Sequence, residues 1–176
     1  MAAPLEKTAT DMSGCYVMNR ELSGDTDLIL SYQNIGWVTR KTLGRVPVTI
    51  TITQTKEAIQ IDSVAAGFIT TNETIKLDDK PHPISHKVWG EITSKAKMIK
   101  VGDIDDETLK EGWVGEDVAE VTSESEVNKW KATQIWGFQD VEVKGEKQRR
   151  YFRRIRLEHK KGIEYCHTCY DYSPIA

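Results

Sequence analysis

The C-terminal segment "IEYCHTCYDY" carries the residues best suited to metal or redox chemistry. Cys166 and Cys169 form a Cys-x-x-Cys pair with His167 between them. Such pairs bind zinc or cycle between thiols and a disulfide. However, the segment has the pattern of a β-strand, on which residues three apart point to opposite faces. The third cysteine, Cys15, stands alone, and the sequence has no second Cys/His cluster to complete four zinc ligands. We therefore expect reduced, inert thiols, no bound metal and no cofactor.

Residues 101–127 are the second candidate for a metal site, because ten acidic residues there accompany a single base. A calcium-binding EF-hand loop needs glycine at its sixth position and glutamate at its twelfth. Counted from Asp103, those positions hold Thr108 and Val114. We therefore interpret 101–127 as an acidic hairpin insertion. Residues 144–161 contain nine bases and two acids, so the two regions can pair across neighbouring strands.

The overall composition argues against several classes of function. The 176 residues carry 24 basic and 27 acidic side chains, for a net charge of −3, so general electrostatic attraction to nucleic acid is not expected. No apolar run approaches the roughly 20 residues of a membrane-spanning helix. The first residues lack the basic-then-apolar pattern of a signal peptide. We expect one cytoplasmic domain, 1–176, with an N-terminal extension at 1–11.

Most of the chain alternates apolar and polar residues with a period of two, which is typical of half-buried antiparallel strands. In "VPVTITIT", for example, Val46, Val48, Ile50 and Ile52 share one face. The alternation places the candidate site residues Trp130, Gln134, Trp136, Phe138, Tyr151 and Arg153 on the apolar faces of two later strands. We expect strands at 46–53, 58–64, 71–77, 87–99, 129–138, 149–157 and 163–172, separated by turn residues.

A single region has helical character, "GDTDLILSYQNIGWVTRK" at 24–41. Asp25 or Thr26 can cap its start, while Asn34 and Gly36 interrupt it, so we expect two short helices. One strand, a helical pair and then a run of strands favour a closed antiparallel up-and-down β-barrel of about ten strands. The helix-turn-helix would form a lid after the first strand. Closure removes the exposed edges that successive hairpins would otherwise leave.

The stretch "DMSGCYVMNRELSGDTDLILSYQNIGWVTRKTLGRVPVTITIT", at 11–53, resembles the intracellular fatty-acid-binding and retinoid-binding protein family of the calycin superfamily. That family opens with a Gly-x-Trp strand, and Gly14 and Tyr16 stand at this step, with tyrosine in place of tryptophan. A helical pair ending in Gly-aromatic-x-Thr-Arg-Lys and then a Pro-led strand follow in the family. The matching residues here are Gly36, Trp37, Thr39, Arg40, Lys41, Gly44 and Pro47. The resemblance implies a lipocalin-like barrel around a hydrophobic ligand.

The last strand departs from this family pattern. Family members end in Cys-Thr-Arg-x-Tyr, whose arginine and tyrosine hold a ligand carboxylate. The segment "CHTCY" keeps Tyr170 but has Thr168 where the family has arginine. The family's second arginine falls near Gln139, although alternation places Gln134 on the apolar face instead. A buried carboxylate without a cation is strongly penalised. The ligand is therefore neutral, or another cation, for which Arg153 is the candidate, takes over; alternatively Arg153 lies in water at the barrel mouth.

We expect a carrier that binds a lipid, terpenoid or polyketide-like molecule not gripped by two arginines. The protein would be a monomer or weak dimer that contacts membranes transiently through portal residues Trp37, Arg40 and Lys41. The expected ligand-binding residues, some of which can instead serve barrel packing, are Tyr16, Ser63, Trp130, Gln134, Trp136, Phe138, Tyr151, Arg153, Thr168 and Tyr170.

Two other functions remain open from the sequence. The first is a cofactor-independent isomerase or cyclase of natural-product biosynthesis that uses the barrel cavity as its active site. Its catalytic candidates are Tyr170, Arg153 and Glu164, and it rests on analogy with other calycin-like barrels. The second is an interaction module without a ligand, whose partner surface is the charged insertion at 101–127.

Overall fold

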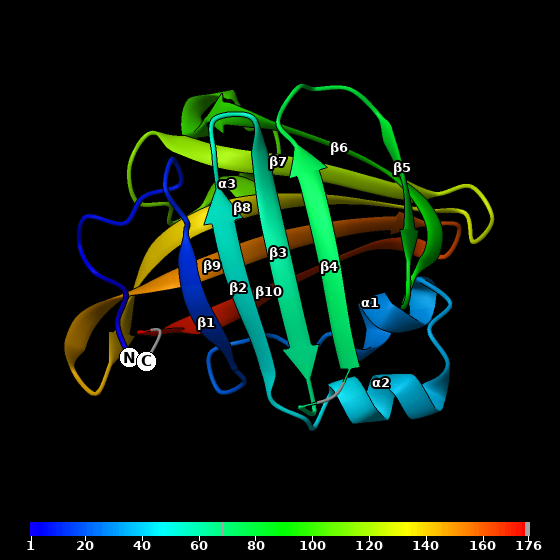
Figure 1. Ribbon diagram of the computed structural model, residues 1–176, viewed down its shortest axis with the longest axis horizontal. Coiled ribbons are helices and arrows are strands. Elements are labelled where there is room, and N and C mark those ends of the chain that lie inside the picture. The colour runs from blue at the N-terminus through cyan, green and yellow to red at the C-terminus, as the bar shows by residue number, and fades with distance from the viewer. Residues whose placement is uncertain (68, 175–176) are drawn as a thin grey trace.

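The computed structural model describes residues 1–67 and 69–174, which form one large antiparallel β-sheet with short helices (Figure 1). The alternating segments form these strands because each can bury one face and leave the other in water. The strands are β1 (Gly14–Asn19), β2 (Val48–Gln54), β3 (Ala58–Ala65), β4 (Ile69–Lys76), β5 (His82–His86), β6 (Gly90–Lys100), β7 (Asp117–Ser125), β8 (Trp130–Val143), β9 (Glu146–His159) and β10 (Gly162–Ser173).

The strands follow one another around a barrel that is nearly closed. Apart from β4 and β5, each strand pairs with its sequence neighbours, and β1 also pairs with β10, so the order is β4-β3-β2-β1-β10-β9-β8-β7-β6-β5. Among the described residues, β4 and β5 share no backbone ladder. We call this break between β4 and β5 the seam. The predicted antiparallel barrel of about ten strands is confirmed, with the refinement that its hydrogen bonding stops at the seam.

Two short helices connect β1 to β2, as predicted. They are α1 (Asp27–Tyr32) and α2 (Trp37–Leu43), which lie together at one end of the barrel, and we call them the lid (Figure 1). Asp25 Oδ1 accepts the backbone N–H of Asp27 at 2.9 Å at the start of α1. Asn34 separates the helices with a positive φ of 64°. None of the described helices is long and apolar enough to cross a membrane.

The end of the barrel opposite the lid is filled by the chain's own side chains. Tyr16 is fully buried, and the centroid of its ring lies 5.1 Å from that of Tyr151 and 6.4 Å from that of Phe138. The N-terminal extension covers this end, since Ala3 is buried and its N–H donates to the carbonyl of Arg149 at 2.8 Å. The aromatic cluster and the extension therefore confine empty space to the lid half of the barrel.

The acidic region at 101–127 does not form the predicted hairpin insertion as one unit, but consists of an outer helical part and a barrel strand. Its second part is the barrel strand β7, and residues 101–116 contain η1 (Val101–Asp103) and α3 (Glu107–Lys110) on the outside of the barrel (Figure 1). Asp106 caps α3 and forms an ion pair with Arg156 of β9 at 3.3 Å. The expected pairing of the acidic and basic regions is therefore present. This outer layer has its own small core of Ile104, Leu109, Val118 and Ile135.

Candidate functional site

Two adjoining cavities lie beneath the lid. One, of about 150 Å³, extends from Leu43 of α2 to Tyr170 of β10. The other, of about 70 Å³, lies between Gln33 at the end of α1 and strands β6 to β9. Glu73, Trp89 and Arg153 line both cavities, so these three side chains form the partition between them.

Arg153 lies inside the barrel rather than in water at its mouth. Alternation along β9 turns it inward, and its backbone pairs with Trp136 of β8 and Thr168 of β10. Its guanidinium carbon stands 4.0 Å from the centroid of the Trp136 ring, a distance at which a cation is attracted to the aromatic face. Arg153 Nε donates to the hydroxyl of Tyr151 at 3.0 Å. The cation is thus held by an aromatic face and one neutral hydroxyl.

Burial changes the ionisation of this cluster. Desolvation raises the pKa of Tyr151 to about 12, and the positive charge of Arg153 only partly opposes that shift. Desolvation lowers the pKa of Arg153, but Tyr151, Tyr170 and Glu73 more than offset it, so the pKa stays above its ordinary value. At neutral pH the site therefore combines a neutral phenol with a charged guanidinium.

Three buried hydrogen-bond donors of the lid half lack an acceptor among the described residues. They are Arg153 Nη2, Thr168 Oγ1 and Trp130 Nε1. Thr168 is the backbone partner of Arg153, and Trp130 lines the smaller cavity. Buried donors are normally satisfied, so each requires an explanation. An acceptor on a molecule bound in the cavities would satisfy Arg153 Nη2, whose side chain lines both of them.

A histidine–carboxylate pair bridges the seam next to Arg153. His86 Nε2 lies 2.9 Å from Glu73 Oε1, which joins β5 to β4 where backbone hydrogen bonds are missing. His86 Nδ1 accepts the backbone N–H of Val88 at 3.0 Å. Because Nδ1 is an acceptor, the ring proton sits on Nε2, which donates to Glu73. The imidazole is therefore neutral, and the cavity keeps one full negative charge, on Glu73.

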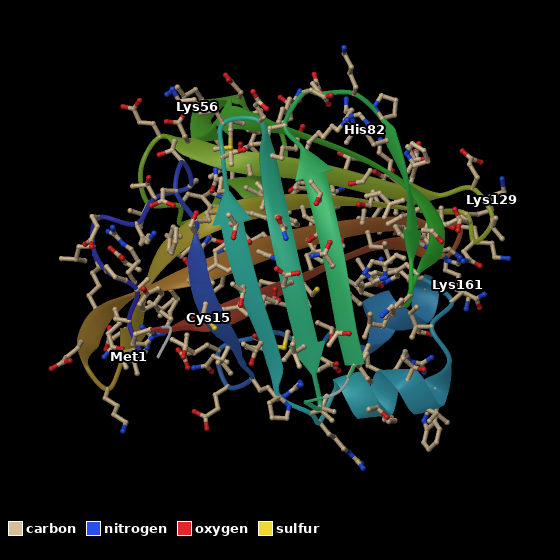
Figure 2. The ribbon with its side chains drawn as sticks, in the orientation of Figure 1. Met1, Cys15, Lys56, His82, Lys129 and Lys161 are labelled. Atoms are coloured by element: carbon tan, nitrogen blue, oxygen red, sulfur yellow. The ribbon has the colours of Figure 1, made fainter. Side chains whose placement is uncertain are left out.

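Trp89 connects the lid to the Glu73–His86 pair at the seam. Trp89 follows β5, and its ring centroid lies 4.2 Å from that of His86. Trp89 Nε1 donates to Gln33 Oε1, at the end of α1, at 3.1 Å. Tyr32 of α1 stacks on His159, and the ammonium of Lys161 lies 5.5 Å from the centroid of the Tyr32 ring. Figure 2 shows Lys161 at the lid end of the barrel. Lid, seam and cavity polar groups thus form one connected set.

The structure gathers most of the sequence-predicted residues, in two groups. Tyr16, Phe138 and Tyr151 belong to the filled end, and Tyr151 also contacts Arg153. Gln134 faces inward, whereas Gln139 faces outward and donates to the carbonyl of Glu111 at 2.7 Å, which settles the register. The predicted residues that line the two cavities are Ser63, Trp130, Gln134, Trp136, Arg153 and Tyr170.

Glu164 stands apart from the other catalytic candidates. It is six residues from Tyr170 along β10, a separation of ~20 Å for an extended strand. The predicted portal residues differ in how exposed their side chains are. Arg40 and Lys41 both form ion pairs with Asp27, at 3.2 and 3.7 Å, but the side chain of Arg40 is 17% exposed and that of Lys41 is 46% exposed. Trp37 is 64% exposed.

Sequence reasoning missed Glu73, His86 and Trp89. One signal was available, because alternation along β4 places Glu73 on the same face as the buried Ile75. Glu73 and His86 lie on strands that are not paired by backbone hydrogen bonds, so no local sequence pattern predicts their contact.

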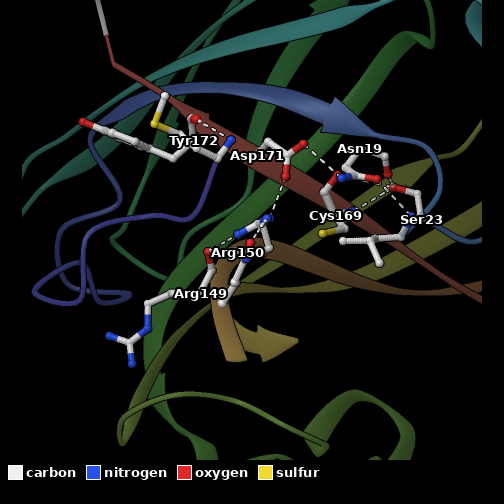
Figure 3. A network of polar contacts seen from close by, with 10 residues as sticks. Asn19, Ser23, Arg149, Arg150, Cys169, Asp171 and Tyr172 are labelled. Carbon is white, nitrogen blue, oxygen red and sulfur yellow. Dashed lines mark hydrogen bonds and ion pairs between the residues drawn. The ribbon is translucent and has the colours of Figure 1, made fainter. Parts of the chain in front are cut away.

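The Cys-x-x-Cys pair is divided between the two faces of β10, as expected. Cys166 points into the lid-side core, whereas Cys169 points outward, where its backbone N–H donates to Ser23 Oγ at 2.9 Å. Figure 3 shows Cys169 beside an ion pair in which Arg150 Nε lies 2.6 Å from Asp171 Oδ1. Burial raises the pKa of both thiols to about 12. No cluster of three or more potential metal ligands occurs among the described residues.

Comparison with solved structures identifies the fold. The REP1-NXSQ fatty acid transporter is 14% identical, covers 96% of this chain and 100% of its own, and gives a TM-score of 0.60. Human cRBP IV is 12% identical over 93% of this chain and 98% of its own, with a TM-score of 0.58. A Schistosoma mansoni fatty acid binding protein in complex with arachidonic acid is 13% identical over 94% and 98%, also at 0.58.

The sequence has low identity to these proteins, at 12–14%. No family model matches the chain, and no curated protein matches it in sequence. The resemblance inferred from residues 11–53 is nevertheless confirmed at the level of architecture. The chain has the fold of the fatty-acid-binding and retinoid-binding proteins.

Proposed function

We propose that the protein binds a small hydrophobic molecule inside its barrel and carries it through the cytoplasm. The observation that carries this proposal is a pair of buried donors on the cavity lining, Trp130 Nε1 and Arg153 Nη2, which have no acceptor among the described residues. Leaving such a donor unpaired costs ~1–3 kcal/mol. A ligand with a polar acceptor would pair with Arg153 Nη2, whose side chain lines both cavities, while its apolar part covers the aliphatic and aromatic lining.

The size of the empty space limits the ligand. The cavities of about 150 and 70 Å³ together remain below the ~300 Å³ at which typical ligand pockets begin. The ligand is therefore shorter than a long-chain lipid, or it enlarges the space by displacing the lid. Each buried methylene contributes ~0.8 kcal/mol, so a medium-length chain supplies enough hydrophobic free energy for measurable binding.

The polar end of the ligand meets one arginine rather than two. Thr168 occupies the position of a family arginine, and Arg153, its neighbour on β9, supplies the positive charge. A hydrogen bond from a charged donor contributes ~1.5–3 kcal/mol. Arg153 therefore serves as the polar anchor of the cavity.

The lid provides a surface for brief contact with a membrane. Trp37 and Val38, on the first turn of α2, are 64% and 70% exposed, and Lys41 follows one turn later. Exposed tryptophan and a nearby cation suit the lipid–water interface. The three cysteines are free thiols, in keeping with a reducing compartment such as the cytoplasm. We expect a monomer or weak dimer.

Native mass spectrometry of the purified protein tests the proposal. We expect a co-purified apolar compound that is lost on mild extraction and a subsequent rise in affinity for added medium-chain probes. Arg153→Met, which keeps the length of the side chain and removes its donors, should weaken binding of a polar probe about tenfold or more, as follows from the loss of a charged hydrogen bond. Lys147→Met, an exposed change on the same strand, is the matched control. A folded protein that binds no apolar probe would refute the proposal.

The second candidate is the cofactor-independent isomerase or cyclase, favoured by the placement of Glu73 and Arg153 on the same two cavities. A carboxylate can remove a proton from the carbon next to a carbonyl, while an arginine stabilises the resulting enolate oxygen. Return of the proton at another carbon gives an isomer with no net gain or loss of atoms. Deuterium exchange into 2-decanone in heavy water tests this step. Exchange no faster than in Glu73→Gln counts against the enzyme.

A further inference from the structure

Because Glu73 and Arg153 both line the two cavities beneath the lid, we propose that the ligand carries an uncharged head group that offers both a hydrogen-bond donor and an acceptor, as an amide or alcohol does. This inference deepens the proposed function and rests on it. It names a ligand class other than a free carboxylate.

The two charged side chains have opposite hydrogen-bonding capacity. An arginine guanidinium only donates, and an ionised glutamate only accepts. Both line the larger and the smaller cavity. Among the described residues they form no direct ion pair with each other, because Arg153 is bonded to Tyr151 and Glu73 to His86. The space between them is therefore accessible to a ligand group that meets one with an acceptor and the other with a donor.

The acceptor capacity of Glu73 is only partly used. Its Oε1 accepts the proton on His86 Nε2, and its Oε2 makes no hydrogen bond among the described residues. The side chain is 20% exposed, and alternation along β4 directs it inward with Ile75. His86 contributes no compensating charge, because its Nδ1 accepts the N–H of Val88. The carboxylate therefore offers the site an acceptor oxygen that has no partner among the described residues.

The charge balance disfavours a carboxylate ligand. The charged side chains that line the cavities are Arg153 and Glu73, so the positive charge already has a negative counterpart within the site. A ligand carboxylate would place a second anion beside Glu73, and the two like charges would repel each other. A neutral head group avoids this repulsion and still satisfies Arg153 Nη2.

Four probes with one common ten-carbon chain test the inference by isothermal titration. Decanamide and decan-1-ol provide a donor and an acceptor, methyl decanoate provides acceptors alone, and decanoate provides a charged acceptor. We expect decanamide to bind about tenfold more tightly than decanoate and more tightly than methyl decanoate at neutral pH. The ranking is measured on the unmodified protein, so it does not depend on the folding of any variant.

Glu73→Gln then identifies the side chain responsible. The amide oxygen of glutamine still accepts from His86, so the seam bond is retained while the charge is removed. We expect the preference for decanamide over decanoate to fall about tenfold in this variant. Glu142→Gln, an exposed change on β8, should leave the preference unchanged.

The possible outcomes distinguish the head-group inference from the proposed function. If the unmodified protein prefers decanoate, or if folded Glu73→Gln keeps the original ranking, the inference about the head group is wrong while hydrophobic binding stands. If none of the four probes binds and no apolar compound co-purifies, the proposed function itself fails. Preference for the neutral amide that depends on Glu73 supports both.

Discussion

The hydrogen bond across the seam should be worth much more than an equivalent bond on the surface of the same strand. β5 offers both cases, with His86 bonded to Glu73 at one end and His82 bonded to Asp78 at the other. Side-chain exposure is 3% for His86 but 31% for His82, which lies at the outer end of the strand in Figure 2. Substitution of each histidine by phenylalanine gives a matched pair of variants.

The expected destabilisation follows from the hydrogen bonds that each substitution removes. His86→Phe keeps a ring against Trp89 but removes the donor to Glu73 and the acceptor of the Val88 N–H. Loss of one bond to a charged group and one neutral bond gives a destabilisation of roughly 2–4 kcal/mol. For a chain of this size the midpoint of thermal unfolding should fall by roughly 5–15 °C. His82→Phe should leave it nearly unchanged, because exposed pairs contribute little.

Thermal unfolding followed by circular dichroism measures the difference, and amide hydrogen exchange locates it. Faster exchange should appear first in β4 and β5, whose seam edges lack ladder bonds, and only later in β9. Equal shifts of the unfolding midpoint in His86→Phe and His82→Phe would refute the reasoning. Hydrogen exchange in His86→Phe that is no faster in β4 and β5 than in the other strands would also refute it.

Three further predictions concern the lid, the thiols and the outer layer. Trp89→Phe removes the bond to the lid, so stopped-flow fluorescence should show faster ligand uptake and release at similar affinity; unchanged rates would contradict the coupling. Because Cys169 is buried and burial raises its pKa to about 12, it should react with a thiol reagent only on unfolding, whereas the partly exposed Cys15 should react in the native protein; labelling and mass spectrometry check this order. Desolvation raises the pKa of Asp106, but hydrogen bonds from Tyr165 and the α3 amides outweigh it, so the pKa is lowered. The stabilisation that Asp106 provides is therefore present above the unfolded pKa of ~3.9 and is lost as the pH falls through the folded pKa. Hydrogen exchange of residues 101–116 should rise over that acidic range and lose this dependence in Asp106→Asn.

Much of the fold could be predicted because period-two patterns and turn residues are local signals. They correctly gave the inward faces of β8 and β9, including Arg153. They failed at residues 117–125, interpreted as part of an acidic hairpin, because Val118 and Ala119 are both fully buried. Val118 contacts the outer core and Ala119 the inner one, so the barrel strand is apolar on both faces there and does not alternate.

The candidate site was predictable only in part. The aromatic residues and Arg153 follow from strand parity, and the loss of the family arginine at Thr168 directed attention to Arg153, which the structure places on the cavity lining. The seam pair could not be found in this way, because β4 and β5 exchange no backbone hydrogen bonds and their contact has no register. The sequence also did not predict that one end of the barrel is filled, because that filling depends on how the N-terminal extension packs against side chains of distant strands.

The position of Glu73 links the stability of the seam to ligand binding. Its Oε1 holds β5 across the missing ladder, and its Oε2 remains available to the cavity. A ligand that donates to Oε2 orders the carboxylate that also accepts from His86, so bound ligand should slow hydrogen exchange at the seam before it affects the opposite wall. Ligand binding to the folded state alone also raises global stability with ligand concentration. Uniform protection of all strands would reveal only this second effect, whereas added protection of β4 and β5 would show that the ligand contacts the group that closes the barrel.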